Sequence, residues 1–127
     1  MVDVLADTIN KIKVYESRGL YECYAPSTKL IRSVLEVMKA NNYIGGFEEV
    51  KEGKFTKLKI TLSKKINDIG VIKPRSSVKL GNYQKYEERY IPSLNFGILI
   101  LATSDGVMTN KEAKQKNIGG RLLAYVY

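Results

Sequence analysis

Two hydroxyl side chains stand next to each other at Thr103 and Ser104, and Asp105 and Gly106 follow them directly. A hydroxyl group both donates and accepts hydrogen bonds, so this pair could bind base edges, sugars or phosphate oxygens. Glycine has no Cβ, and Gly106 therefore allows a partner to approach the backbone closely. The chemistry of residues 103–106 fits a polar ligand such as a nucleic acid.

The segments on either side of this loop determine how it would be positioned. Residues 98–101 are continuously apolar and predict a buried strand, whereas residues 109–112 fit the capping box that begins a helix. A helix N-terminus has free N–H groups that attract anions, and Lys111 and Lys114 would add positive charge. The pattern predicts a strand-to-helix loop that binds an anion at one edge of a sheet. An ordinary connection would contain the same turn and cap residues, so spacing alone leaves both interpretations open.

Two further segments could meet an anion. The first is residues 26–29, where Ser27 is expected to cap a helix and Lys29 opposes the helix dipole, a cost that a bound phosphate would offset. The second is the basic loop with Lys73 and Arg75, which could follow the phosphates of a nucleic acid. A solvated loop explains Lys73 and Arg75 equally well.

The residue types that most catalytic and metal sites require are missing from the sequence. It contains no histidine, so Ser104 has no imidazole to activate it, and the commonest metal ligand is absent. Cys23 is the only cysteine and is expected to be a buried small hydrophobe in a strand rather than a nucleophile. The adjacent carboxylates at 48–49 and 87–88 are expected to be solvated. We therefore expect no catalytic residue, no metal and no cofactor.

The charge of the chain is unevenly distributed. The 127 residues carry a net charge of +8, with ten Lys/Arg against eight Asp/Glu in residues 1–62 and eleven against five in residues 63–127. The excess in the second half indicates a polyanionic partner, although lysine-rich solubility would give the same balance. No apolar run approaches the ~20 residues of a membrane span, and residues 1–4 lack a basic signal-peptide head. A cytoplasmic protein without a membrane partner is expected.

Periodicity and turn residues predict an α+β fold of two small domains in contact, residues 1–66 and residues 67–127. The first domain is expected to have the order α-β-α-β-β, and the second to be β-rich with short helices. In the strand expected over 55–62, apolar residues alternate with polar ones. The other expected elements are helices over 3–16, from Ser27 to about 41, over 81–90 and from about 110 to Gly119, and strands over 20–25, 43–50, 71–75, 98–101 and 122–127.

Four segments resemble the small-subunit ribosomal protein eight family, and the likeness covers essentially the whole chain. In chain order they are Pro26-Ser27-Thr28-Lys29-Leu30, Ile72-Lys73-Pro74-Arg75, Thr103-Ser104-Asp105-Gly106-Val107-Met108-Thr109 with Glu112-Ala113, and Ile118-Gly119-Gly120. The last two are specific in their order and separation. The ending over residues 119–127 is similar to the archaeal branch of the family.

The resemblance implies two small domains in contact and a primary binder of the central domain of small-subunit rRNA that supports assembly. The protein would then lie in the cytoplasmic ribosome among neighbouring small-subunit proteins, and some members of the family also bind their own mRNA. The RNA-contacting loop of the family corresponds to Thr103, Ser104 and Gly106, with support from Ser27 and Lys29.

Two residues of the loop depart from the family pattern. Ala102 stands where a hydroxyl residue is common, which removes one hydroxyl from the loop, and Asp105 stands where other members carry a neutral or basic residue. Phosphates repel a carboxylate, so we expect the Asp105 side chain to turn inward or to cap the loop.

A function of another class also remains open. The chain could be a protein-interaction or RNA-accessory module that docks through its last strand, at Tyr125-Val126-Tyr127. An exposed edge on that strand would favour this alternative.

Overall fold

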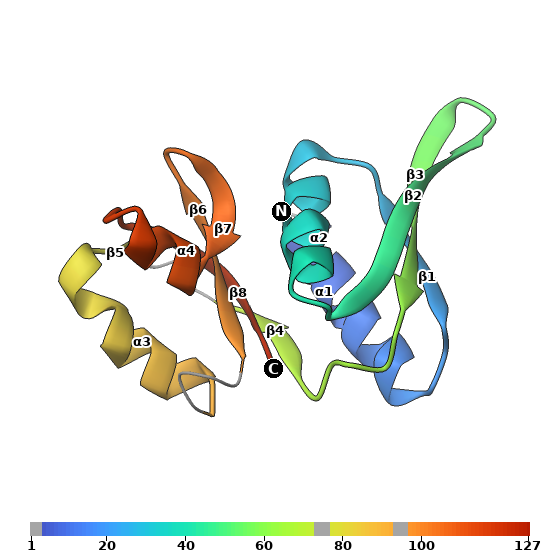
Figure 1. Cartoon of the computed structure of the whole chain (residues 1–127). Coiled ribbons are helices and arrows are strands. Elements are labelled where there is room, and N and C mark those ends of the chain that lie inside the picture. Colours follow the sequence, from blue (N-terminus) through green and yellow to red (C-terminus); the bar gives the residue numbers. More distant parts are fainter. Residues whose placement is uncertain (1–3, 73–76, 93–96) are drawn as a thin grey trace. The chain divides into compact units, whose positions relative to one another are not determined.

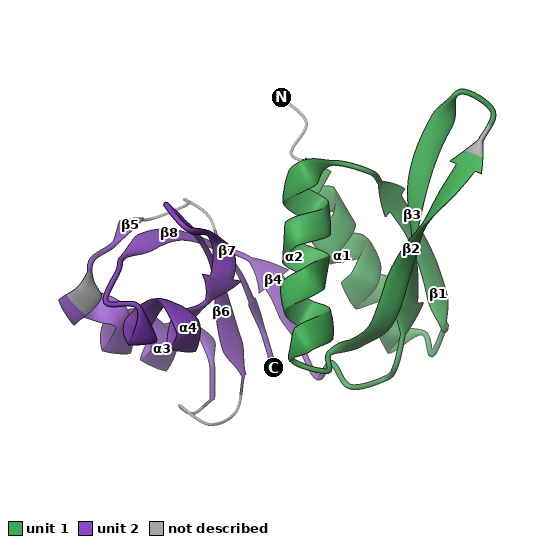
Figure 2. Cartoon of the chain, turned by 45° about the horizontal axis from the view of Figure 1, so that its top comes forward, with its two compact units in different colours: residues 1–66 green, residues 67–127 purple. Residues whose placement is uncertain are grey.

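The structure is a computed structural model that describes residues 4–72, 77–92 and 97–127. The chain divides into two compact units, residues 1–66 and residues 67–127, each of which contains its own antiparallel sheet (Figure 2). Helices and sheets in both units confirm the predicted α+β class, whereas the independence of each unit as a domain stays a prediction. Among the described residues, no helix has the length and apolar character needed to cross a membrane.

Unit 1, residues 1–66, places two helices on one face of a three-stranded sheet (Figure 1). The strand order is β1-β3-β2, and both pairings are antiparallel. The predicted alternation in β3 is confirmed, because Leu58, Ile60 and Leu62 are buried, whereas Lys57 and Thr61 are exposed. The elements are α1 (Val4–Ser17), β1 (Glu22–Pro26), α2 (Lys29–Ala40), β2 (Ile44–Glu52) and β3 (Phe55–Leu62).

Unit 2, residues 67–127, is built around a sheet in which the last strand occupies an interior position. The order is β4-β8-β6-β7, and the short strand β5 also pairs with β8. Its elements are β4 (Ile69–Val71), β5 (Ser77–Val78), the 3-10 turn η1 (Leu80–Asn82), α3 (Tyr83–Tyr90), β6 (Ile98–Thr103), β7 (Gly106–Thr109), α4 (Asn110–Gln115) and β8 (Gly120–Val126). Since β8 pairs with β6 on one side and with β4 and β5 on the other, it offers no open edge for the docking alternative.

The core of unit 2 joins α3 and α4 to one face of this sheet. Leu99 and Leu101 of β6, Leu122 of β8 and Tyr83 of α3 belong to one buried cluster. The Tyr83 hydroxyl donates a hydrogen bond to the carbonyl oxygen of Ile118, at 2.7 Å. This contact ties the first turn of α3 to the segment that follows α4.

The predicted end of the fourth helix at Gly119 is wrong. The helix α4 ends at Gln115, and Asn117 takes the left-handed backbone conformation with φ 56°. Gly119 and Gly120 instead lie where the backbone of another strand is too close to leave room for a Cβ. A Cβ on Gly119 would lie 2.3 Å from the Val78 carbonyl oxygen, and one on Gly120 would lie 2.7 Å from that of Ala102.

We predict that Cys23 is unreactive in the folded chain. Its side chain is 1% exposed, and burial raises the pKa of the thiol to about 11. Because only the thiolate reacts, alkylation by iodoacetamide at pH 8 is expected to be about a hundredfold or more slower than that of a free thiol. Mass spectrometry of the alkylated chain over time measures this rate, and alkylation at the free-thiol rate would contradict the buried placement.

The raised thiol pKa also predicts a dependence of stability on pH. The folded state favours the protonated thiol. The contribution of the thiol to the free energy of unfolding is therefore complete below about pH 9 and is lost as the pH rises through about 11. Urea unfolding of the chain and of Cys23→Ala at several pH values isolates this contribution. The stability difference between the two proteins is expected to shrink above pH 9, and a constant difference would exclude this titration.

Candidate nucleic-acid interface

The loop that contains Thr103 and Ser104 is a β-hairpin turn, so the predicted strand-to-helix loop is wrong. Thr103 ends β6 and pairs with Gly106 at the start of β7, with Ser104 and Asp105 between them (Figure 1). The helix α4 begins only at Asn110, at the opposite end of β7. The hydroxyls and the helix N-terminus are therefore separated by a strand and do not form one anion site.

The two neighbouring hydroxyls of the turn have different roles. The Thr103 hydroxyl donates to the Gly106 carbonyl oxygen at 2.8 Å and accepts from the Asp105 N–H at 3.1 Å. Both bonds lie within the turn and fix its shape. Ser104 is exposed at the tip, and its hydroxyl is the one that the turn presents to solvent.

Asp105 and Gly106 complete the surface of the turn. Asp105 is exposed, so the expectation that its side chain turns inward is wrong; the Thr103 hydroxyl caps the turn in its place. Gly106 has φ +109°, a conformation that side-chain-bearing residues rarely adopt, and a Cβ there would meet no atom within 4 Å. Gly106 is thus constrained by its φ angle and by its pairing with Thr103, and the space where a Cβ would stand is open to a partner.

Strand pairing adds an arginine that sequence reasoning missed. Arg121, at the start of β8, pairs with Ala102 of β6 and with Ser77 of β5, and it is exposed. Residues paired across antiparallel strands present their side chains on the same face. Arg121 therefore lies next to Ala102, one residue before the end of β6, and adds an exposed cation to the strands that lead to the turn. In the sequence, Arg121 stands out only because it directly follows two glycines. That position does not predict which residue it pairs with.

Lys111 and Lys114 both lie on α4, but in different surroundings. The Thr109 half of the capping box predicted at the start of this helix is confirmed, because the Thr109 hydroxyl accepts from the Glu112 N–H at 3.2 Å. Lys111 is exposed in the first turn. The Lys114 ammonium contacts both carboxylate oxygens of Glu87, at 2.6 and 2.7 Å. Of the two cations, Lys111 is the one better placed to neutralise a phosphate.

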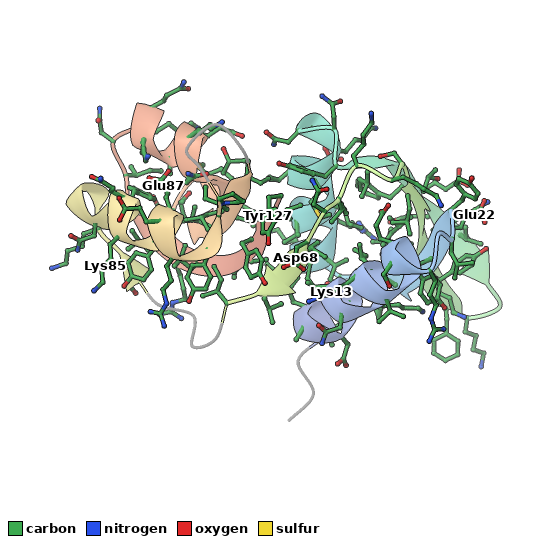
Figure 3. All side chains as sticks on the ribbon, turned by 90° about the horizontal axis from the view of Figure 1, so that it is seen from below. Lys13, Glu22, Asp68, Lys85, Glu87 and Tyr127 are labelled. Atoms are coloured by element: carbon green, nitrogen blue, oxygen red, sulfur yellow. The ribbon has the colours of Figure 1, made fainter. Side chains whose placement is uncertain are left out.

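Glu87 is buried, so the expectation that it is solvated is wrong. Its side chain is 2% exposed and projects from α3 toward α4 (Figure 3). Besides Lys114, it accepts a hydrogen bond from the side-chain amide of Asn110, and the amide oxygen of Asn110 accepts from the Leu99 N–H at 3.2 Å. This network satisfies the carboxylate and connects α3, α4 and β6.

The predicted helix start in unit 1 has a different cap from the one expected. Thr28, rather than Ser27, is the N-cap of α2, and its hydroxyl accepts from the Ile31 N–H at 3.2 Å. Ser27 instead accepts from the guanidinium of Arg32, at 2.6 and 3.1 Å. Lys29 is exposed in the first turn. Ser27 thus contacts a second cation of this segment, Arg32, which is also paired with Glu49.

The remaining predicted site residues, Lys73 and Arg75, fall outside the described residues. Over the described parts of the chain, no three His, Cys, Asp or Glu residues gather in a way that could hold a metal ion. The described candidates are therefore the turn at residues 103–106 with Arg121 on an adjacent strand, Lys111 at the start of α4, and, within unit 1, Ser27 and Lys29 at the start of α2.

Comparisons with known proteins agree over nearly the whole chain. Residues 3–127 match the family model described as Ribosomal protein S8. The proteins named "Small ribosomal subunit protein uS8" of Thermoplasma volcanium and of Thermoplasma acidophilum are each 53% identical to it over 126 residues. Each alignment covers 98% of this chain and 98% of the relative.

We expect Lys114→Met to lower the free energy of unfolding by about 2 kcal/mol, because Glu87 would remain buried with Asn110 alone. Lys111→Met, on the same helix but exposed, is the matched control and should change stability by less than about 0.5 kcal/mol. Urea unfolding measures both. The double variant Glu87→Gln with Lys114→Met should recover part of the loss, and equal losses in the two lysine variants would refute the network.

Because the Thr103 hydroxyl bonds within the turn and that of Ser104 is exposed, the two residues should differ in their effect on stability. Thr103→Val should lower the free energy of unfolding by about 1 kcal/mol, because two hydrogen bonds of the turn are lost. Ser104→Ala should leave it within about 0.5 kcal/mol of the original value. Thermal unfolding of both variants tests this difference, and a larger effect at Ser104 would reverse the assignment of the two hydroxyls.

Proposed function

This chain belongs to the ribosomal protein S8 family, and from that membership we propose that it is a constituent of the small ribosomal subunit and a primary binder of the central domain of its rRNA. The observation that carries the proposal is the family match over residues 3–127. Relatives from Thermoplasma with the same small-subunit name confirm the predicted archaeal-like branch.

The proposed RNA contact is the hairpin turn between β6 and β7. The exposed hydroxyl of Ser104 can bond to RNA groups without moving, because the two bonds of Thr103 hold the turn rigid. The free space where a Cβ would stand on Gly106 lets RNA approach the turn closely. Asp105 is exposed in the same turn, so phosphates should pass beside Ser104 and Gly106 rather than over this carboxylate.

Exposed cations of the chain would supply the affinity that does not depend on RNA sequence. Arg121 and Lys111 are exposed in unit 2, and Lys29 is exposed in unit 1. Lysine and arginine neutralise phosphates and release counterions, which makes binding depend on salt. Ser27, Lys73 and Arg75 are proposed as further backbone contacts, and Lys114 as a weaker one because Glu87 already neutralises it.

The turn is suited to an irregular feature of RNA rather than to a regular duplex. The major groove of A-form RNA is too deep and narrow for side chains to read, so specificity depends on loops, bulges and unstacked bases. A short hairpin turn with one free hydroxyl can reach such a feature. The same surface would bind the chain's own mRNA if that mRNA carried a similar fold.

The proposed role involves no catalytic step. The exposed Ser104 hydroxyl has no histidine in the sequence to activate it, and the buried thiol of Cys23 has a raised pKa. Neighbouring small-subunit proteins are further proposed partners. Since the last strand β8 is paired on both sides, these partners are expected to use other surfaces.

We predict that Ser104→Ala weakens binding to a fragment of the rRNA central domain about tenfold, which corresponds to one hydrogen bond worth about 1.4 kcal/mol. Binding to a random RNA duplex should change less than about twofold, because that binding is mostly electrostatic. Filter binding at fixed salt measures both constants. Equal losses on the two RNAs would show that the turn does not select RNA shape.

Lys111→Ala is the electrostatic counterpart to this variant. It should weaken binding to both RNAs and reduce the slope of log K against log salt by roughly 0.7–0.9, the value for one phosphate contact. Ser104→Ala should leave the slope unchanged. A slope that falls in both variants would mean that Ser104→Ala changes the number of neutralised phosphates and does not only remove a hydroxyl hydrogen bond.

A further inference from the structure

The outward face of the sheet in unit 1 carries two aromatic side chains that contribute little to its core. Tyr24 of β1 is 42% exposed, and Phe55 at the start of β3 is 73% exposed. The opposite face of the same strands is apolar and buried, with Cys23, Ala25 and Leu58 at most 3% exposed. Folding therefore does not require aromatic rings at these two outer positions.

The strand ends at this place leave a hollow beside the end of β1 and the start of β3. The strand β1 ends at Pro26, which pairs with Lys57, whereas β3 begins two residues earlier, at Phe55. Beyond Pro26, the β2–β3 hairpin continues without β1 beside it (Figure 1). Tyr24, Phe55 and Pro26 line a hollow of about 370 Å³ at this step, a volume in the range of small-ligand sites.

The polar groups around the hollow are mainly cationic. Lys11 of α1 and Lys57 of β3 line it, and none of the described residues that line it is a carboxylate. Lys59 faces Tyr24 across the strands but is paired with Glu22 at 3.3 Å, and this carboxylate raises the pKa of Lys59. Glu22 is thus paired with a lysine that does not line the hollow.

We propose that this hollow is a second RNA site, in which an unpaired base stacks on Tyr24 or Phe55 while its flanking phosphates lie beside Lys11 and Lys57. Aromatic rings interleaved with cations bind single-stranded RNA because every base has a face that can stack. The charge around the hollow favours a polyanion over an apolar peptide segment. The proposal rests on the proposed function in taking RNA as the ligand, but it uses none of the residues of the hairpin turn at 103–106.

The test uses the full chain and a fluorescein-labelled oligoadenylate of about eight nucleotides, a single strand long enough to cover such a site. Phe55→Ala should weaken binding about tenfold in fluorescence anisotropy at low salt, and Phe55→Tyr should retain it because a ring remains. The side chain is 73% exposed, so both variants are expected to keep the unfolding midpoint of the original chain.

Two further variants separate this site from other surfaces. Tyr21 is 67% exposed, does not line the hollow, and has its ring centroid 4.6 Å from the Lys64 ammonium. Tyr21→Ala is therefore the matched aromatic control and should bind the oligoadenylate normally. Ser104→Ala should also bind the oligoadenylate normally, whatever its effect on the rRNA fragment. Failure of the full chain to bind the rRNA fragment would refute the proposed function, whereas the oligoadenylate results decide the hollow alone.

Three results would overturn the second site. The first is an unchanged affinity in Phe55→Ala, and the second is an equal loss in Phe55→Ala and Tyr21→Ala, which would indicate general surface stacking. The third is no binding of the oligoadenylate to the original chain, the outcome expected if a protein segment occupies the hollow. Ultraviolet cross-linking of the bound oligomer to Tyr24 or Phe55, identified by mass spectrometry, would support the site directly.

Discussion

In unit 2, the buried carboxylate of Glu87 connects the two helices to the strand that leads into the hairpin turn. Glu87 of α3 is 2% exposed, and an unpaired charge at such a position would be very costly. Lys114 and Asn110 of α4 meet it, and Asn110 also accepts a hydrogen bond from the backbone of Leu99 in β6. Because β6 leads directly into the turn, the pairing of this one charge fixes both helices against the strand from which the proposed RNA contact projects.

In the turn, the hydroxyl of Thr103 fixes the backbone, and the neighbouring hydroxyl of Ser104 is exposed. Thr103 uses its hydroxyl within the turn, so the tip keeps its shape when it is free of ligand. Ser104 then presents its hydroxyl at low entropic cost, which is how rigid loops gain affinity. The hollow at Tyr24 and Phe55 represents a different chemistry, since stacking tolerates any base. A shape-selective contact and a sequence-tolerant one would complement each other on a folded RNA.

Local patterns in the sequence were enough to predict the features that depend on neighbouring residues. The alternation in β3, the burial of Cys23 and the N-cap at Thr109 follow from periodicity and from side-chain chemistry within a few residues. The family was also predictable, because its specific motif around residues 103–109 lies in one continuous segment. These features require no knowledge of which distant segments pair.

Residues far apart in the chain decided what the sequence left open or predicted wrongly. Residues 107–109 became a strand because they pair with 100–102, and Glu87 is buried because a helix more than twenty residues later supplies Lys114. Arg121 lies opposite Ala102, next to the turn in the chain, only because β8 pairs with β6. The sequence by itself thus determined the family, the fold class and the residue types of the loop. Only the tertiary structure decided which hydroxyl, which cation and which backbone group face outward, because burial and strand pairing are set by long-range contacts.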